Sequence, residues 1–374
     1  MSETSIKKTA QNLLELADVK INGSRPWDIQ VQNEDFYSKV LSGGSLALGE
    51  SYIDGWWDCQ ELDQFFARVL GADLDKKIGL SLPVIMNYLR AKFTNRQKKN
   101  RAHIVGERHY DAGNDLFQLM LDKRMIYSCG YWKDAQSLDD AQEAKLDLIC
   151  RKLKLKSGMS VLDIGCGWGG LAKYAAEKYN VKVVGLTISK EQAKLAQDLC
   201  AGLPVEIRLQ DYRDVVEKFD RIVSIGMFEH VGHKNYKTYM QVANRCLEHG
   251  GLFLLHTIGS NEGALKIDPW IEKYIFPNGV VPVYKQISNA AKGIFEIRDW
   301  HDSEGLDYDQ TLMAWHKNFN SGYGLIKQKY DGQFKRMWNY YLLCCAGSFR
   351  VKKNTVWQIV LSKKGPDIAY ESVR

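Results

Sequence analysis

One short stretch of this sequence, VLDIGCGWGG at residues 161–170, restricts the possible folds more than any other. It has the pattern of a buried strand that ends near Asp163, turns through a group of glycines and continues into a helix. Glycines at such a turn let the backbone bend sharply and approach a ligand closely. The N-terminus of the following helix supplies N–H donors and the positive end of a helix dipole. The stretch therefore predicts a ligand-binding loop in an α/β fold.

Strands and helices alternate from about residue 107 onward. Buried strands are predicted at 160–164, 181–186, 205–210, 219–225 and 251–258, with helices between them at 171–178, 190–200 and 236–247. Further along, the pattern predicts a strand at 294–300, a helical region from residue 308 to about 347, and a last strand at 356–362. Such alternation is typical of a doubly wound sheet with mostly parallel strands.

Residues 1–75 follow a different pattern. Apolar residues recur at helical spacing in LLELA, FYSKVL and ELDQFFARVL, which predicts a compact helical unit. We therefore divide the chain into an N-terminal helical domain (1–86), a basic linker (87–106) and an α/β domain (107–374). Residues 78–90 are predicted to form an apolar helix, which suits a membrane interface or equally a helix packed on the neighbouring domain.

Positive charge is concentrated in one part of the chain. Residues 76–106 contain eight basic residues and no acidic residue, whereas the net charge of the whole chain is +6. Two interpretations are open for this segment: a solvated linker, or an electrostatic contact with an anionic surface, either lipid or nucleic acid. No apolar stretch approaches the ~20 residues needed to span a bilayer, and the first residues do not resemble a signal sequence.

Cysteine usage favours a reducing compartment. The eight cysteines form no CxxC pair and have no zinc-type spacing with histidine. A chain of this size does not need disulfides for stability, so we expect free thiols, no metal site and a cytoplasmic location. His230 and His233 form an HxxH pair without a further ligand, and we interpret them as structural.

The glycine loop leaves two cofactor classes open. GCGWGG formally satisfies the GxGxxG pattern of dinucleotide-binding loops. The acid two residues before the first glycine, Asp163, instead resembles the loop of S-adenosylmethionine-dependent methyltransferases, and this is the interpretation we favour. In many of those enzymes the second strand ends in an acid that holds the ribose, but here Thr187 stands in that place. Either Gln192, in the first turn of the next helix, reaches the ribose, or the cofactor is bound more weakly than is typical.

Ten stretches, in order along the chain, resemble the cyclopropane-fatty-acyl-phospholipid synthases. They are HYDAGNDLF (109–117), YSCGYW (127–132), DIGCGWGG (163–170), GLTISKEQ (185–192), QDYRD (210–214), GMFEHVG (226–232), LLHTIGS (254–260), YIFPNG (274–279), DYDQTLMAWHKNF (307–319) and CAGSFR (345–350). Relatives that modify mycolic acids share several of these stretches but lack the N-terminal unit. The resemblance therefore implies that the domain 1–86 is lipid- or membrane-associated and that 107–374 is the S-adenosylmethionine-dependent catalytic domain. The resemblance implies an α/β fold of the Rossmann-like class I methyltransferase type. Its sheet is expected to have seven mostly parallel strands with an antiparallel last strand, next to a small helical N-terminal domain.

The resemblance also implies an activity. It is the transfer of a methylene group from S-adenosylmethionine to the cis double bond of an unsaturated phospholipid acyl chain, with bicarbonate as the proton acceptor. The implied partner is phospholipid rather than nucleic acid, and the implied assembly is a homodimer associated peripherally with the inner face of the membrane. A lipid methyltransferase that closes no ring is the alternative, and a nucleic-acid-binding or membrane-adaptor protein on a degenerate domain is a second one.

Site residues follow from the same matches. Tyr110 and Asp111 match the segment that closes over the cofactor, and Arg213 matches the border of the adenine. The other implied cofactor contacts are Asp163, Gly165, Cys166, Gly167, Thr187, Ile188, Gln192, Gln210, Asp211 and Tyr212. The implied catalytic and bicarbonate-binding residues are Cys129, Glu229, His256, Tyr308 and the backbone of Ile258. Cys345 matches a cysteine once assigned as the active-site residue of the family; it is a nucleophile or, in the interpretation we favour, a core or pocket-lining side chain.

The chemistry of ring formation sets three demands on such a site. Water has to be excluded, because it would capture the carbocation that forms when the alkene attacks the sulfonium methyl group. Aromatic faces stabilise a desolvated cation by roughly 1–2 kcal/mol each. Aromatic residues that could meet this need, although core packing explains each one alone, are Tyr127, Trp132, Phe228, Trp270, Tyr274, Phe276, Tyr340 and Tyr341. A base must also remove one proton, and we expect Glu229 to orient the bicarbonate and His256 to donate to it. The acyl chain needs access from the bilayer, for which the segment 76–106 and the loop YIFPNG are the proposed places.

Overall fold

The computed structural model describes residues 3–74, 113–261, 267–363 and 369–374. These residues form two compact units. The first unit combines the described part of Met1–Arg96 with Ile267–Pro277 and Leu312–Asn354, and the second combines the described parts of Gln97–Lys266 and Thr355–Arg374 with Asn278–Thr311. The predicted domain boundaries at 86 and 106, the helix predicted at 78–90 and the basic segment 76–106 all lie outside the described residues.

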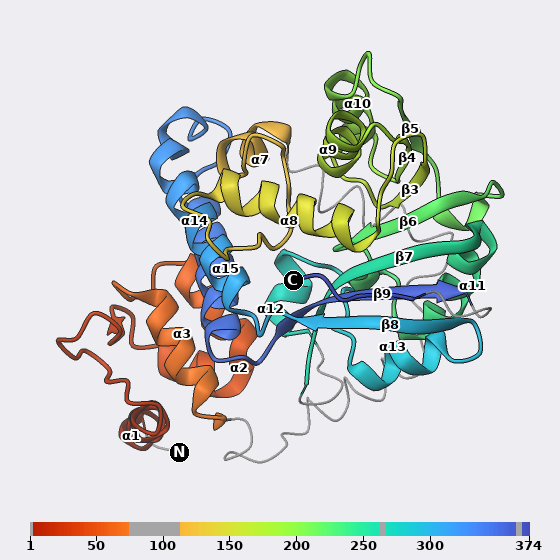
Figure 1. The fold of residues 1–374 in the computed structure, drawn as a ribbon. Helices are drawn as coiled ribbons and strands as arrows, with labels where there is room; N and C mark the ends of the chain where they lie inside the picture. The colour runs from red at the N-terminus through yellow and green to blue at the C-terminus, as the bar shows by residue number, and fades with distance from the viewer. Residues whose placement is uncertain (1–2, 75–112, 262–266, 364–368) are drawn as a thin grey trace. The chain divides into compact units, whose positions relative to one another are not determined.

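A seven-stranded sheet forms the centre of the second unit (Figure 1). Its strands are β3 (Ser160–Ile164), β4 (Lys182–Thr187), β5 (Val205–Leu209), β6 (Phe219–Ile225), β7 (Leu247–Gly259), β8 (Phe295–Asp302) and β9 (Thr355–Lys363). They lie in the order β5-β4-β3-β6-β7-β9-β8. Neighbouring strands from β5 to β7 are parallel, and β9 is antiparallel to both β7 and β8. The predicted sheet is confirmed, including its antiparallel last strand.

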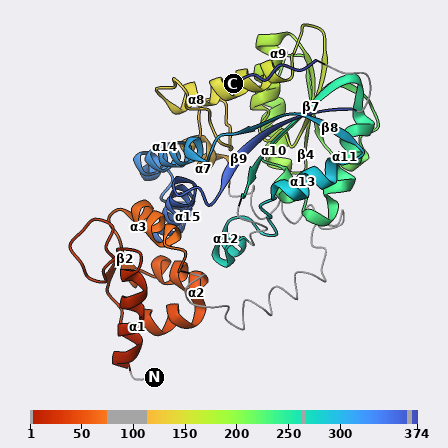
Figure 2. The same ribbon diagram turned by 60° about the horizontal axis from the view of Figure 1, so that its bottom comes forward.

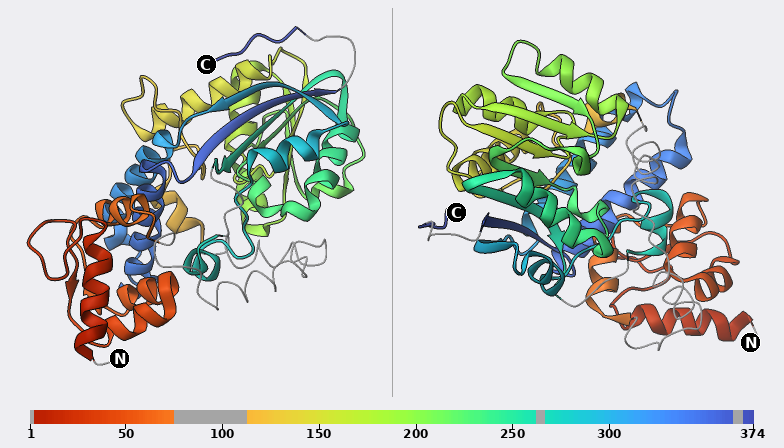
Figure 3. Two further views of the ribbon diagram at one scale, coloured as in Figure 1. Left: turned by 90° about the horizontal axis from the view of Figure 1, so that it is seen from below. Right: turned by 90° about the vertical axis from the view of Figure 1, so that its right-hand side faces the viewer.

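Helices cover both faces of this sheet (Figures 2 and 3). The helices of the unit are α7 (Asn114–Met120), α8 (Leu138–Lys152), α9 (Gly170–Tyr179), α10 (Lys190–Leu199), α11 (Tyr236–Cys246) and α13 (Tyr284–Ala291), with short 3-10 turns at η2 (Tyr212–Asp214), η3 (Phe228–His230) and η4 (His233–Asn235). Apolar side chains of α8 and α9 pack on one face of the sheet, and those of α11 and α13 pack on the other. The unit is therefore a three-layer α/β structure.

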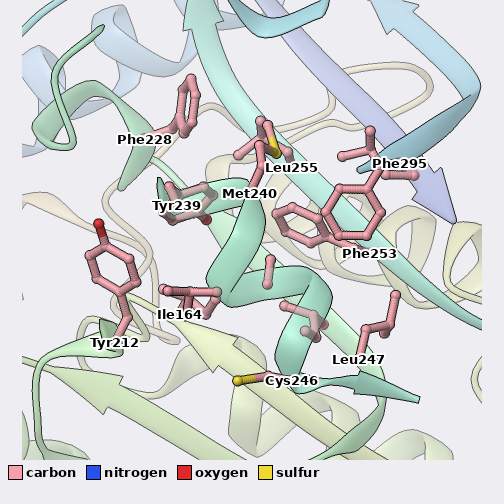
Figure 4. Close-up of a cluster of buried hydrophobic side chains, with 14 of the residues drawn as sticks. Ile164, Tyr212, Phe228, Tyr239, Met240, Cys246, Leu247, Phe253, Leu255 and Phe295 are labelled. Carbon is pink, nitrogen blue, oxygen red and sulfur yellow. The ribbon is translucent and has the colours of Figure 1, made fainter. Parts of the chain in front are cut away.

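The strand β7 shows why the central strands are continuous apolar runs in the sequence. Its residues Phe253 and Leu255 belong to the cluster with α11 and α13, which Figure 4 shows in close-up. The alternate residues Leu252 and Leu254 belong to the cluster with α8 and α9. A strand covered on both faces has no solvent side, so it keeps no polar alternation. The same alternation turns the next residue of that series, His256, toward the layer of α8 and α9.

The first unit is mainly helical, as predicted for the N-terminal part. It contains α1 (Glu3–Glu15), α2 (Phe36–Ile53), α3 (Leu62–Gly71), α12 (Pro269–Tyr274), the later part of α14 (Leu306–Gly322), η5 (Tyr323–Leu325) and α15 (Gly332–Arg350), with a short strand pair β1 (Gln30–Val31) and β2 (Trp57–Asp58). Trp57 is fully buried and its ring lies 5.3 Å from that of Phe65. Gly347 of α15 lies against α3, where a Cβ atom would come within 2.8 Å of the backbone nitrogen of Ala67.

No helix in the described ranges has the length and apolar character needed to cross a bilayer.

Candidate active site

A cavity opens at the carboxyl ends of β3, β4 and β6, which is where ligands bind in open α/β sheets. Among the residues that line it are Asp163, Gly165, Cys166, Gly167, Thr187, Ile188, Gln192, Gln210, Asp211, Tyr212 and Arg213. Every predicted cofactor residue of the described chain is thus brought to one cavity. Tyr110 and Asp111 lie outside the described residues.

The glycine loop between β3 and α9 adopts the backbone that the sequence predicts. Gly165 has a φ of 86°, in the left-handed region that favours glycine, and a Cβ atom there would come within 2.8 Å of the Met227 side chain. The backbone N–H groups of Gly165 and Cys166 both donate to the carbonyl oxygen of Leu186, at 3.0 and 2.8 Å. These bonds hold the loop against the end of β4, so that its backbone forms one wall of the cavity.

Asp163, the acid before the glycines, is buried at the end of β3. Burial raises the pKa of its carboxyl to about 7, although the positive charge of Lys145 partly opposes this rise in pKa. Lys145 reaches the same cavity from α8 and is only 1% exposed. The floor of the cavity therefore holds one acid and one amine, both removed from water.

The two residues predicted at the ribose contact each other directly. The Thr187 hydroxyl donates to Oε1 of Gln192 at 2.8 Å, and both side chains are buried. The backbone N–H of Gln192 in turn donates to the Ser189 hydroxyl at the N-cap of α10. Because Oε1 of Gln192 accepts from Thr187, the amide NH₂ of Gln192 is the end that is left to donate to a ligand hydroxyl.

The residues predicted at the adenine, Asp211 to Arg213, are held in place by an ion pair between two of them. Asp211 caps the turn Tyr212–Asp214 by accepting from the backbone N–H of Arg213 at 2.9 Å. Its carboxylate also accepts from the Arg213 guanidinium, at 2.6 and 2.8 Å. This pairing fixes the rim of the cavity and leaves the Tyr212 ring along it.

Glu229 stands close to the carboxyl end of β7. Its Oε1 accepts from the backbone N–H of Ile258 at 2.7 Å, and its Oε2 is buried without a hydrogen-bond partner among the described residues. Burial raises the pKa of the Glu229 carboxyl to about 7. A buried acceptor without a partner is unfavourable unless a ligand or water satisfies it.

His256 lies two residues before Ile258 on β7 and is 4% exposed. Its Nδ1 lies 3.3 Å from Nε2 of Gln358, the residue paired with it on β9. An amide nitrogen can only donate, so Nδ1 is the acceptor and the ring proton is on Nε2. Burial lowers the pKa of His256 well below its usual range, with smaller contributions from Lys145, Lys152 and His301. The ring is therefore neutral and presents one N–H donor.

A second, smaller pocket connects this histidine with the predicted cysteine. Its lining residues are Cys129, Gly130, Tyr131, His256, His301, Ser303, Asp307, Val356 and Gln358. Two of its polar atoms, the Ser303 hydroxyl oxygen and Oε1 of Gln358, are buried and have no partner among the described residues. The Cys129 thiol donates to the carbonyl oxygen of Gly130 at 3.2 Å. Burial raises the pKa of this thiol well above its usual range, so it remains protonated.

Two of the predicted bicarbonate-binding residues line the same pocket, and the others are connected to it through neighbouring residues. Cys129 and His256 line one pocket. Glu229 is tied to the strand of His256 through Ile258. Tyr308 follows the lining residue Asp307 in the first turn of α14 and is half-buried. Their roles remain predictions, although the arrangement offers donors and acceptors of the kind that a small oxyanion needs.

The other predicted residues are divided between the two units. Cys345 belongs to the first unit, on α15. Burial raises the pKa of its thiol to about 12, which disfavours the thiolate that a nucleophile requires. Of the aromatic residues considered for the cation, Tyr127 lines the larger cavity, and Phe228 packs in the core against Tyr236. The five that belong to the first unit are Trp270, Tyr274, Phe276, Tyr340 and Tyr341.

Sequence reasoning missed several residues of the two cavities. The most important are Ser128, Lys145, Trp168, Gln358 and His301. Trp168 lies inside the glycine loop and could have been found there, and its indole N–H donates to the Asn114 side chain at 2.8 Å. His230, interpreted as structural, also lines the larger cavity.

Comparison with known proteins shows which family this chain belongs to. Residues 97–359 match the family model described as mycolic acid cyclopropane synthetase. The chain belongs to this family. Cyclopropane-fatty-acyl-phospholipid synthase of Escherichia coli (strain K12) is 55% identical over 356 residues, which is 95% of this chain and 93% of that protein. Cyclopropane mycolic acid synthase 1 of Mycobacterium tuberculosis (strain ATCC 25618 / H37Rv) is 36% identical, over 68% of this chain and 95% of that protein.

Solved structures of family members agree with the fold. The cyclopropane synthase MmaA2 from Mycobacterium tuberculosis has a TM-score of 0.65 and 33% identity, over 70% of this chain and 98% of that chain. The mycolic acid cyclopropane synthase CmaA1 complexed with SAH and CTAB has a TM-score of 0.65 and 34% identity, with the same coverage. The predicted Rossmann-like methyltransferase fold and the resemblance to cyclopropane synthases are both confirmed.

Proposed function

We propose that this protein is a cyclopropane-fatty-acyl-phospholipid synthase. It transfers a methylene group from S-adenosylmethionine to the cis double bond of an unsaturated phospholipid acyl chain. The observation that carries this proposal is the 55% identity to the E. coli enzyme of that name across 95% of the chain. The proposal includes a bicarbonate ion as proton acceptor, bound near Glu229 and His256.

The larger cavity fits S-adenosylmethionine. The cofactor, when bound, supplies an electrophilic methyl group on a sulfonium. Its amino-acid part would lie against the loop at Gly165 and Asp163, its ribose against Thr187 and Gln192, and its adenine against Tyr212. The free NH₂ group of Gln192 can donate to a ribose hydroxyl, which compensates for the missing acid at the end of β4.

The region around Glu229 fits a bicarbonate ion. When bound, this ion supplies a base for the proton that leaves the new methyl group. A bicarbonate carries both acceptor oxygens and one hydroxyl donor, and the region offers both kinds of partner. Oε2 of Glu229, whose carboxyl is bonded to the strand of His256 through the Ile258 N–H, is a buried acceptor without a partner in the described chain. In the smaller pocket that His256 lines, Oε1 of Gln358 is another such acceptor. The Nε2–H of His256 and the hydroxyl of Ser303 are donors.

The residues of this chain keep that proton acceptor dry and oriented. Glu229 and His256 are at least nine-tenths buried, so the interactions they make are stronger than they would be in water. Because the pKa of Glu229 is about 7, its carboxyl changes protonation near neutral pH and can share a proton with a bound anion. His256 stays neutral and donates without adding charge.

Product analysis tests the function. The purified chain is incubated with S-adenosylmethionine and vesicles of monounsaturated phospholipid, with and without bicarbonate, and the lipids are then examined by mass spectrometry and proton NMR. A gain of one methylene mass per chain together with loss of the olefin signal is expected, and only with bicarbonate. The same mass gain with a retained olefin signal would identify a lipid methyltransferase that closes no ring. No mass gain would refute the proposal.

We also propose that the protein works in the cytoplasm as a homodimer at the inner face of the membrane. The eight basic residues of 76–106 supply the positive charge that anionic lipid attracts. All eight cysteines are free, in keeping with a reducing compartment. Co-sedimentation with anionic vesicles and sedimentation-velocity analysis test these two statements separately.

A further inference from the structure

Two lysines of α8 are buried. Lys145 is 1% exposed and Lys152 is 0% exposed. Seven residues separate them, which is close to two helical turns, so both side chains leave the same face of the helix. That face packs on the sheet, through Leu146, Ile149 and Cys150 among others. Fully buried lysines are rare unless they are paired, so each needs an explanation.

Lys145 supports the segment that carries Cys129. Its ammonium donates to the Ser128 hydroxyl at 2.8 Å, and Gln142 on the same helix donates to the Ser128 carbonyl oxygen at 2.8 Å. No carboxylate of the described residues lies within ion-pair distance of Lys145. The positive charge is thus only partly compensated, one residue away from a residue that lines the smaller pocket.

Lys152 supports the opposite side of the same pocket. Its Nζ lies 2.7 Å from Nδ1 of His301, and His301 is a lining residue. The nearest carboxylate oxygen, on Asp299, is 3.9 Å away. Asp299 is itself bonded to the guanidinium of Arg374 at 2.6 and 2.8 Å. Since Asp299 is shared in this way, it neutralises Lys152 incompletely.

Three side chains that line the smaller pocket lie on the face of the sheet that α8 covers. His301, Gln358 and His256 are cross-strand neighbours on β8, β9 and β7, so their side chains lie on one face of the sheet. That is the face toward α8, because the residues at alternate positions, Leu254 and Val360, belong to the cluster with α8.

The charges of both lysines act on the pocket. Burial lowers the pKa of Lys145 to about 8 and that of Lys152 to about 7. Each in turn contributes to the lowered pKa of His256, and Lys145 also lowers the pKa of Cys129 against the rise that burial causes. A negative charge placed in the pocket would be stabilised by both amines. The acids that oppose this effect, Glu229 and Asp307, have raised pKa values because they are buried as well.

We propose that Lys145 and Lys152 are positioning residues that set the affinity of the smaller pocket for the bicarbonate ion. They do not touch the reacting atoms. They supply the positive potential that draws a small monoanion out of water, acting through Ser128 on one side and His301 on the other. This inference rests on the proposed function.

The test is the bicarbonate dependence of Lys152→Met and Lys145→Met, compared with wild type in carbon-dioxide-depleted buffer. Methionine keeps the length and removes the charge. Removing one charge that acts across a dry pocket is expected to raise the half-saturating bicarbonate concentration about tenfold in each variant. Turnover at saturating bicarbonate is expected to recover in Lys152→Met, whereas Lys145→Met is compared by its half-saturating concentration alone, because Lys145 also lines the larger cavity. Lys173→Met is the matched control, because Lys173 lies on the neighbouring helix α9 with a 36% exposed side chain and pairs with Glu177. It is expected to leave the bicarbonate dependence unchanged.

The outcomes separate the two proposals. A wild-type protein that makes no cyclopropane product would refute the proposed function. A productive wild type whose half-saturating bicarbonate is the same in both lysine variants would refute this inference alone. A loss of turnover in Lys152→Met that saturating bicarbonate does not restore would also count against it, because a purely structural role predicts that result.

If a lysine variant does not fold, as judged by circular dichroism and S-adenosylmethionine binding, the pH dependence of bicarbonate binding by the wild-type protein is the test. Raising the pH from about 6.5 to about 9 removes most of the positive charge of both lysines, because the pKa of Lys145 is about 8 and that of Lys152 about 7, so bicarbonate binding should weaken about tenfold. The groups that face Lys145 are Asp122, Asp163 and Cys129, and those that face Lys152 are Asp299, His301, Arg374 and Arg151. An unchanged half-saturating concentration over this range would overturn the inference.

Discussion

Because the carboxyl of Glu229 is buried, we expect the substitution Glu229→Gln to change both the stability of the protein and its activity. Replacement by glutamine keeps the size of the side chain and the bond from the Ile258 N–H to Oε1. It removes the ability to take a negative charge. In the wild type, burial raises the pKa of Glu229 from 4.5 to about 7, so ionising it in the folded protein is unfavourable.

The magnitude follows from the linkage between protonation and folding. The folded-state pKa is raised, so the stability that the protonated carboxyl contributes is fully present below about pH 4.5 and is lost as the pH rises to about 7. A change from 4.5 to about 7 corresponds to about 3 kcal/mol. The difference in unfolding free energy between Glu229→Gln and wild type should therefore change by about 3 kcal/mol in favour of the variant across this window. The constant effect of the new amide cancels in that comparison.

Urea unfolding at about pH 4 and about pH 8, with both proteins, measures this difference. Turnover is measured in parallel at about pH 8, where the variant is expected to lose at least about 100-fold in activity while its S-adenosylmethionine affinity by calorimetry stays within a few-fold. Parallel stability profiles would show that the Glu229 carboxyl is not desolvated. A variant with wild-type turnover would remove Glu229 from the mechanism.

Three further predictions concern the cofactor and the membrane. Gly165→Ala should abolish S-adenosylmethionine binding in calorimetry, because the residue has a φ of 86° and a Cβ atom would crowd a neighbouring side chain at 2.8 Å. Gly158→Ala, at a φ of 85° with open space around it, is the matched control and should only lower the melting temperature. Thr187→Val should weaken cofactor binding about tenfold by releasing Oε1 of Gln192 from its 2.8 Å bond; an unchanged affinity would remove this pair from the ribose site. Neutralising the basic residues of 98–101 should weaken binding to anionic vesicles more at low than at high salt, and a salt-independent loss would assign the segment to folding.

Much of the second unit could be predicted from the sequence because its signals are local. The strand of residues 219–225 is predicted with the observed ends, since Ile222 and Val223 at its centre are apolar and are buried on opposite faces of the sheet. The glycine loop is equally local, because its backbone needs residues without a Cβ atom at fixed places. Within the described chain, the residues predicted to bind the cofactor lie in such loops and line one cavity.

The helix α8 was missed for a physical reason. Its buried face includes Gln142, Lys145 and Lys152, and these polar residues interrupt the apolar spacing that identifies a buried helix. Their burial depends on partners that are distant in sequence, such as His301. Likewise, sequence order gave no sign that residues 312–354 belong to the first unit with α3. The two-residue strands β1 and β2 are too short to leave a periodic signal.

The position of β9 has a consequence for the synthesis of this protein. It lies between β7 and β8, although it is the last strand in the sequence. During translation, β7 and β8 emerge from the ribosome earlier and each has an open hydrogen-bonding edge until β9 arrives. The strand also carries Gln358, which holds the imidazole of His256. A nascent chain therefore lacks this contact to His256 and is exposed to edge-to-edge association until β9 is inserted, so expression should depend on chaperones that shield such edges.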